Sequence, residues 1–247
     1  MEFNASSANL LKIKVDSLIL PTGSQLKNNA KVIDETLDGT ISSLIKAGDF
    51  TGKSSEICVL HTLGQSHKRI ILLGTDGAST PQKMIKVIEA GARAAQKTTS
   101  AKVLWVGESL GDDHEWQASI VARSTLTAGY KYAGTGKKPK PNKLKSATYW
   151  TDSKKLSNAA SAGLQYGSAI GGGMNAARQL GNLPANICTP NYLAAQAKLL
   201  AKGQAKLTTS IVKEAEMKTL KMGSLLSVSA GSVEPGNLIV MKYQGAK

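Results

Sequence analysis

Short apolar runs alternate with longer stretches of helical hydrophobic periodicity through the first 150 residues. The apolar runs lie at 18–20, 56–61, 69–73, 102–106 and 146–150, and the helical stretches lie at 30–47, 81–97 and 115–128. Strands separated by helices are typical of an α/β sheet that is largely parallel or mixed, because a parallel neighbour needs a crossover connection. Thr80 before Pro81 predicts a helix start, and Gly48 predicts a helix end.

The composition changes after Trp150, where small residues become frequent. Residues 154–180 carry Ala and Gly at helical spacing and predict one long helix. Further helices are expected at 190–202 and 213–221, with strands at 206–212 and 238–243. We therefore expect an α/β domain over 1–152, a linker helix and loop over 153–185, and the start of a second α/β domain over 186–247.

Positive charge is concentrated in one part of this chain, whose formal net charge is +14. Nine basic residues lie between Arg123 and Lys155, against the single acid Asp152. The loop 131–145 is rich in Gly, Pro and Lys, and its candidate nucleic-acid contacts are Lys137, Lys138, Lys140, Lys143 and Lys145. Lysines suit contact with phosphates and not base recognition. The alternative is a solvated loop without a partner.

Three other patterns favour structural explanations. The segment 48–54 is similar to a phosphate-binding loop, but it has three residues between its glycines where that motif needs four. Three glycines at 171–173 lie within a helical pattern and indicate close helix packing. Asp112, Asp113 and Glu115 surround His114 before a helix, where acids cap the first turn; a metal site there would need more ligands.

The two cysteines, Cys58 and Cys188, give no reason to expect a disulfide, and the first 11 residues lack the pattern of a signal peptide. Cys58 lies in an apolar run that predicts a buried strand. No run approaches the ~20 apolar residues of a membrane span. A cytoplasmic protein without membrane contact is the expectation.

Two segments carry a family resemblance. The run 175–194, NAARQLGNLPANICTPNYLA, resembles the signature around "AR-L-N-P-N-TP--LA" of the leucyl aminopeptidases, the M17 (cytosol aminopeptidase) family. The run 221–235, KMGSLLSVSAGSVEP, is similar to the family segment "GMGSLLAV--GS-EPP", with Gly236 in place of the second proline. Residues 238–245 resemble the strand that enters the family's active site, and weaker matches extend the resemblance over nearly the whole chain.

The resemblance implies a two-domain metallopeptidase with a macro-domain-like N-terminal domain. The catalytic domain of such an enzyme binds two divalent metal ions, typically Zn or Mn, and releases N-terminal residues, leucine preferred, from peptides. Members are commonly cytosolic homohexamers, and some bacterial members bind DNA.

The family's metal-binding and catalytic segments, "VGKG--FDSGG" and "NTDAEGR", do not occur in residues 1–247. We therefore assign no catalytic residue, no metal ligand and no bound cofactor to this chain, and we expect it to be inactive alone. The alternative is a non-catalytic module that binds DNA or a small ligand, with the loop 131–145 as its contact surface.

Overall fold

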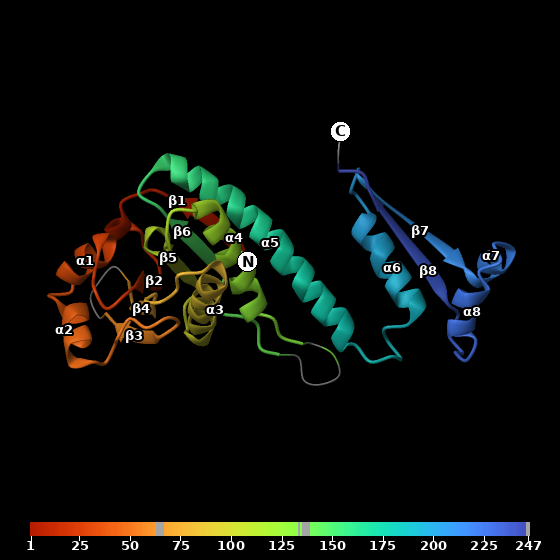
Figure 1. Cartoon of the computed structure of the whole chain (residues 1–247), viewed down its shortest axis with the longest axis horizontal. Helices are drawn as coiled ribbons and strands as arrows, with labels where there is room; N and C mark the ends of the chain where they lie inside the picture. The colour runs from red at the N-terminus through yellow and green to blue at the C-terminus, as the bar shows by residue number, and fades with distance from the viewer. Residues whose placement is uncertain (63–66, 133, 135–138, 246–247) are drawn as a thin grey trace. The chain divides into compact units, whose positions relative to one another are not determined.

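A computed structural model describes residues 1–62, 67–132, 134 and 139–245 (Figure 1). By its internal packing the chain divides into two compact units, Met1–Arg178 and Gln179–Lys247. Within the described part of the chain, no helix has both the length and the hydropathy of a membrane span.

The first unit is built on a six-stranded sheet in the order β1-β6-β5-β2-β4-β3. Its strands are β1 (Glu2–Ser6), β2 (Ser17–Thr22), β3 (Ile57–His61), β4 (Arg69–Gly74), β5 (Lys102–Val106) and β6 (Ser146–Trp150). All neighbours pair in parallel except β3, which pairs antiparallel with β4. The expected mixed α/β sheet is therefore confirmed. Cys58 is only half-buried, because β3 is an edge strand.

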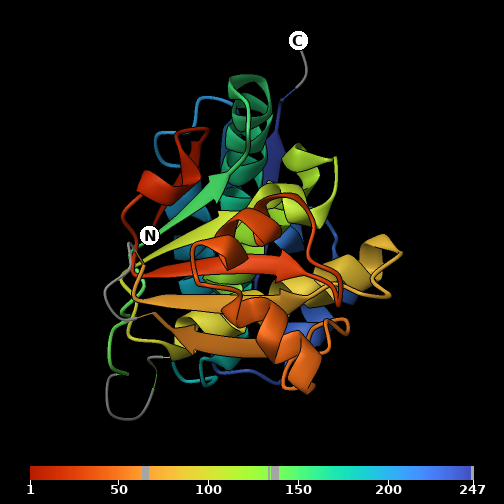
Figure 2. The same cartoon turned by 90° about the vertical axis from the view of Figure 1, so that its left-hand side faces the viewer.

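Helices cover both faces of this sheet, and Figure 2 views it from the side of α1 (Asn28–Glu35) and α2 (Thr40–Ala47). The opposite face carries α3 (Pro81–Lys97), α4 (His114–Ala128) and α5 (Lys154–Asn182). Two short 3-10 helices, η1 (Leu10–Lys12) and η2 (Gly107–Leu110), complete the unit. Leu18 and Leu20 face α1 and α2, whereas Ile19 faces α3 and α4. This alternation follows from the two-residue period of a strand.

The expectation of one helix over residues 30–47 is wrong, because the chain breaks into α1 and α2. Asp38 and Gly39 adopt left-handed backbone angles, with φ of 51° and 73°. The Asp34 carboxylate then accepts a hydrogen bond from the amide of Ile41 at 2.7 Å, which satisfies the start of α2. Gly48, with φ of 84°, ends α2 as expected.

Glycines on one face of α5 allow this helix to lie against α4 (Figure 1). A Cβ atom at Gly163 would lie 1.9 Å from the carbonyl oxygen of Glu115, and one at Gly167 would lie 1.9 Å from that of Ser119. Of the predicted packing glycines at 171–173, Gly171 contacts α4, whereas Gly172 has open space around it. The close contacts therefore recur every four residues.

The second unit contains α6 (Pro190–Ala201), β7 (Leu207–Lys213), α7 (Glu214–Thr219), α8 (Gly223–Ser229) and β8 (Asn237–Tyr243). β7 and β8 form an antiparallel pair with Leu207 opposite Tyr243. The Thr189 hydroxyl caps α6 by accepting a hydrogen bond from the Tyr192 amide, and Gly203 follows the helix with φ of 79°. Sequence patterns did not predict β1 or α8.

Alanine at Gly167 is expected to destabilise the protein, because the new methyl group would meet backbone that cannot move away. Overpacking costs about 1–3 kcal/mol, which outweighs the gain of ~1 kcal/mol in helix propensity. Gly172→Ala is the matched control in the same helix, and it should stabilise the fold or leave it unchanged. Urea denaturation of both variants measures the difference. Equal effects of the two substitutions would contradict the proposed α4–α5 packing.

Candidate functional site

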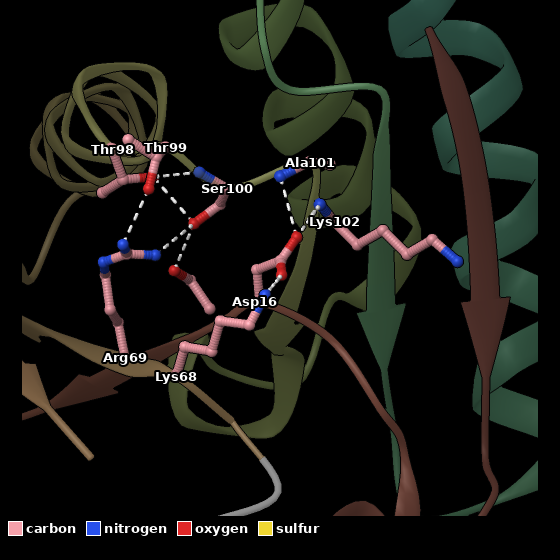
Figure 3. A network of polar contacts seen from close by, with 9 residues as sticks. Asp16, Lys68, Arg69, Thr98, Thr99, Ser100, Ala101 and Lys102 are labelled. Carbon is pink, nitrogen blue, oxygen red and sulfur yellow. Dashed lines mark hydrogen bonds and ion pairs between the residues drawn. The ribbon is translucent and has the colours of Figure 1, made fainter. Parts of the chain in front are cut away.

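The carboxylate of Asp16 holds together the amino-terminal ends of neighbouring strands in the sheet (Figure 3). One carboxylate oxygen accepts hydrogen bonds from the amides of Ala101, at 2.8 Å, and Lys102, at 3.1 Å. The other accepts a bond from the Lys68 ammonium group at 2.9 Å. The backbone carbonyl of Asp16 also accepts from the Arg69 amide. This residue therefore fixes the starts of β2, β4 and β5 relative to one another.

Hydrogen bonding favours the ionised form of the Asp16 carboxyl group. The Lys68 ammonium group holds the pKa of the Asp16 carboxyl below its ordinary value, and the amides of Ala101 and Lys102 act in the same direction against partial burial. The Lys68 side chain is 74% exposed, so its ion pair adds little stability. We therefore attribute most of the structural effect to the two backbone amides, and the network's role is structural.

A pocket of about 420 Å³ lies at the carboxyl-terminal ends of the strands of the same sheet. It lies at the ends of β2 and β4 and beside η2, and Thr22, Ser24, Lys27, Asp76 and Glu108 contribute to its wall. The strand order reverses between β2 and β5, and α/β sheets bind ligands at such a reversal. The position is therefore that of a small-molecule pocket.

The two acids of this pocket hold its loops in place. Asp76 accepts a hydrogen bond from the Ser24 amide at 2.7 Å. Glu108 accepts from the Asn29 side-chain amide at 2.9 Å and from the Asp152 amide at 2.6 Å. Burial, and then the neighbouring Asp152, raise the pKa of Glu108. Both carboxyl groups help to hold these loops, and each keeps acceptor capacity beyond the bonds named here.

The described end of the basic loop, residues 139–145, leads into the start of β6, at the opposite end of the strands from this pocket. Lys145 directly precedes β6, and its amide donates to the carbonyl of Ala101. Lys140, Lys143 and Lys145 are exposed. The Asn142 side chain, which donates to the carbonyl of Gly129 at 2.6 Å, and the buried Leu144 anchor the loop to the unit. Lys137 and Lys138 lie outside the described residues. Nucleic-acid contact by these lysines stays a prediction.

The acidic cluster before α4 acts as a helix cap. Asp113 accepts a hydrogen bond from the Trp116 amide at 3.0 Å. His114 is buried, and its Nδ1 lies 3.2 Å from the Tyr149 hydroxyl. Across residues 1–62, 67–132, 134 and 139–245, no group of three or more His, Cys, Asp or Glu side chains is placed to hold a metal ion.

In the second unit, the carboxylate of Glu214 organises the segment before β8. It accepts hydrogen bonds from the Gly236 amide at 2.7 Å and the Ser229 hydroxyl at 2.9 Å. The Gly236 amide, followed by Ser229, lowers the pKa of the Glu214 carboxyl. Sequence reasoning missed this residue, because a single Glu at the start of a short helix gives no signal of a contact 22 residues away.

Comparison with known proteins places both units in one family. The N-terminal domain of the cytosol aminopeptidase family matches residues 18–139, and the catalytic domain of that family matches residues 175–247. With the α/β fold described above, the two matches define the class as an α/β protein that combines these two domain types. The chain belongs to the cytosol aminopeptidase (M17) family, and it holds the N-terminal domain and the start of the catalytic domain.

Individual relatives agree with this assignment. A probable cytosol aminopeptidase of Nitrosococcus oceani is 35% identical over 257 residues, which cover 100% of this chain and 51% of that protein. One from Paraburkholderia phytofirmans is 35% identical over 252 residues, covering 97% of this chain and 49% of that protein. The chain therefore spans about half the length of the curated relatives it matches.

Solved structures support the fold. A tomato leucine aminopeptidase mutant superposes with a TM-score of 0.83 at 23% identity, covering 100% of this chain and 52% of that one. The bottromycin maturation enzyme BotP, in complex with Mn, gives a TM-score of 0.70 at 18% identity, covering 93% of this chain and 45% of that one. At these identities the likeness shows the α/β architecture alone.

Asp16→Asn should remove part of the pH dependence of stability. Because the folded-state pKa of Asp16 is lowered, its contribution is present above the ordinary carboxyl pKa of about 4 and is lost as pH falls through the folded value. Asn keeps one oxygen that can accept from both amides, so the variant loses the negative charge and the Lys68 pair, and we expect it to lose about 1 kcal/mol at pH 7 and less at pH 3, by urea denaturation. Asp112→Asn, at an exposed position, is the control. A deficit that stays constant between the two pH values would contradict this role.

Proposed function

We propose that this chain is the front part of an aminopeptidase that releases N-terminal residues, with leucine preferred, from peptides. The observation that carries the proposal is the match of residues 175–247 to the family's catalytic domain, in the same chain as the matched N-terminal domain at 18–139. The names of the relatives, cytosol aminopeptidases, support an aminopeptidase activity for the whole protein. We retain the domain boundaries proposed from the sequence, 1–152, 153–185 and 186–247.

Two divalent metal ions, Mn or Zn, belong to this proposal for a full-length enzyme. When bound, such ions polarise a peptide carbonyl and activate a water molecule. The described residues of this chain do not fit them, since they contain no group of three metal-ligating side chains. The family's metal-binding segments are also absent from the 247 residues. We therefore derive no step through the metals and assign no catalytic residue here.

The 247-residue chain is accordingly proposed to be inactive alone. Peptide substrates, assembly into a homohexamer and a cytoplasmic location are proposed for the full-length enzyme by analogy with its family. In each case the support is the family assignment and not a contact within this chain.

An assay with leucine p-nitroanilide tests this proposal, in buffer with Mn²⁺, with Zn²⁺ and without metal. We expect the purified chain to give no turnover above the blank, because its described residues contain no group of three side chains placed to hold a metal ion. A full-length leucine aminopeptidase in the same buffers is the positive control. Metal-dependent release of p-nitroaniline by the purified chain would show that the site is complete within these residues.

A non-catalytic binding module is the second candidate. The exposed Lys140, Lys143 and Lys145 favour contact with DNA, whereas the pocket at the carboxyl-terminal ends of the strands favours a small ligand. The two features lie at opposite ends of the strands, so they would be separate sites. A gel shift at two salt concentrations distinguishes DNA binding through phosphates, which weakens steeply with salt.

A further inference from the structure

His67 is buried at the amino-terminal ends of β2 and β4, on the face of the sheet that α1 covers. Its exposed fraction is 7%, and it belongs to the wall of a small hollow of about 80 Å³. The rest of this wall is mainly apolar, and it consists of Leu11, Leu18, Ile33, Leu37 and Ile70, with Thr36 and Thr62 as its other polar members. The imidazole therefore lies in surroundings that solvate a charge poorly.

One nitrogen of the His67 ring lacks a hydrogen-bond partner. Nδ1 is shielded from solvent, and no group of the described residues lies in bonding geometry with it. Buried polar atoms nearly always have a partner, because leaving one unpaired costs free energy. An imidazolium carries N–H on both ring nitrogens, so its Nδ1 must donate. Protonation would therefore place a donor where the described residues offer no acceptor.

The bonds around residue 67 join several chain segments at these strand ends. The Thr62 hydroxyl donates to the carbonyl of His67, and the Thr62 amide donates to the carbonyl of Lys68 at 3.1 Å. The Arg69 amide then donates to the carbonyl of Asp16 at 3.1 Å. His67 therefore lies next to the bonds that hold the start of β4 to the end of β3 and to the segment before β2.

Ionisable side chains on the segments packed around the ring do not neutralise a charge at His67. In chain order these side chains are Lys12, Lys14, Asp16, Lys31, Asp34, Glu35, His61, Lys68 and Arg69. Asp16 is bonded to Lys68, and Asp34 holds the start of α2. Glu35 is exposed. The pKa of His67 responds to burial and to one backbone bond, and to no charged group of the described residues.

We propose that His67 is an acid-sensitive latch: its neutral ring stays closed among η1, β2 and α1, and proton uptake releases the ring together with the start of β4. A charged imidazole is solvated far better by water than by an apolar wall, so the proton favours a locally open form in which the ring reaches solvent. The bonds beside residue 67 then open more often, while the rest of the sheet stays folded.

Linkage between proton binding and opening fixes the pH range of the latch. Burial lowers the pKa of His67, and a hydrogen bond with the backbone of Val15 is the smaller, opposing effect. The closed form is therefore fully favoured above the ordinary imidazole pKa of about 6.5, and it loses this advantage as the pH falls below that value. Asp16 acts only below about pH 4, because its pKa is lowered. Glu108 lies at the other ends of the strands.

Amide hydrogen exchange between pH 7.5 and 5, corrected for the intrinsic pH dependence of exchange, tests the latch. The amides of Thr62 and Arg69 should lose protection below pH 6.5, by up to about tenfold per pH unit, the limit for one proton. The amides of Gly74 and Thr75, at the carboxyl-terminal end of β4, should keep theirs. Constant protection at Thr62 and Arg69 would overturn the proposal, and so would an equal loss at both ends of the strand.

Two histidine substitutions assign the response to one residue. His67→Gln keeps a side-chain donor but takes up no proton in this range, so the protection of Thr62 and Arg69 should no longer depend on pH. His61→Gln is the matched control, because His61 is exposed on β3 and should leave the wild-type response intact. A response that survives in His67→Gln, or that disappears in His61→Gln, would overturn the proposal.

NMR titration of the His67 ring in the wild type gives a readout that does not require a variant to fold. The chemical shift of the proton on Cε1 reports the charge of the ring directly. We expect its midpoint below the ordinary value of about 6.5, because the closed form disfavours the charged ring. A midpoint at or above that value would show that the closed form accommodates the imidazolium, and it would overturn the proposal.

Discussion

Both faces of the parallel sheet in the first unit must be covered, because its central strand is buried on every side. All six residues of β2 are buried, and its side chains alternate between the two hydrophobic clusters of the unit. A parallel strand of this kind needs crossover helices on both faces. The pairs α1–α2 and α3–α4 meet that need, and α5 reaches α4 only because glycines remove the side chains between them.

The same constraint separates the two ends of the sheet. Parallel strands place all their amino ends at one edge, where Asp16 joins three strand starts and the basic loop enters β6. Their carboxyl-terminal ends lie at the other end of the sheet, where the pocket beside Asp76 and Glu108 is found. The bonds that anchor the strands and the candidate ligand pocket therefore lie at opposite ends of the parallel strands.

Much of this fold could be predicted from local patterns. Strands β4, β5 and β6 and helices α3 and α6 have strong hydrophobic periodicity or an N-cap followed by proline, and the structure agrees with them. Strand β1 could not be found this way, because Glu2–Ser6 is mostly polar and is fixed by pairing with β6, some 140 residues later. The residues Asp38-Gly39 favour a turn and so indicate a break between two helices. The hydrophobic periodicity of 30–47 favours one continuous helix, and it was the stronger pattern in the sequence.

The first unit has a large buried core, whereas the second unit buries few apolar side chains, and we infer that the second unit is much less stable than the first. Among the described residues of the second unit, the buried apolar side chains are Ala194, Ala197 and Met217, while Val228 is 82% exposed and Tyr243 is 72% exposed. Hydrogen exchange on a dilute sample, with light scattering to confirm a monomer, measures this difference in stability. We expect slow exchange in β2, β4 and β5 and exchange faster by orders of magnitude in β7 and β8. Equally slow exchange in both units of a monomer would contradict it.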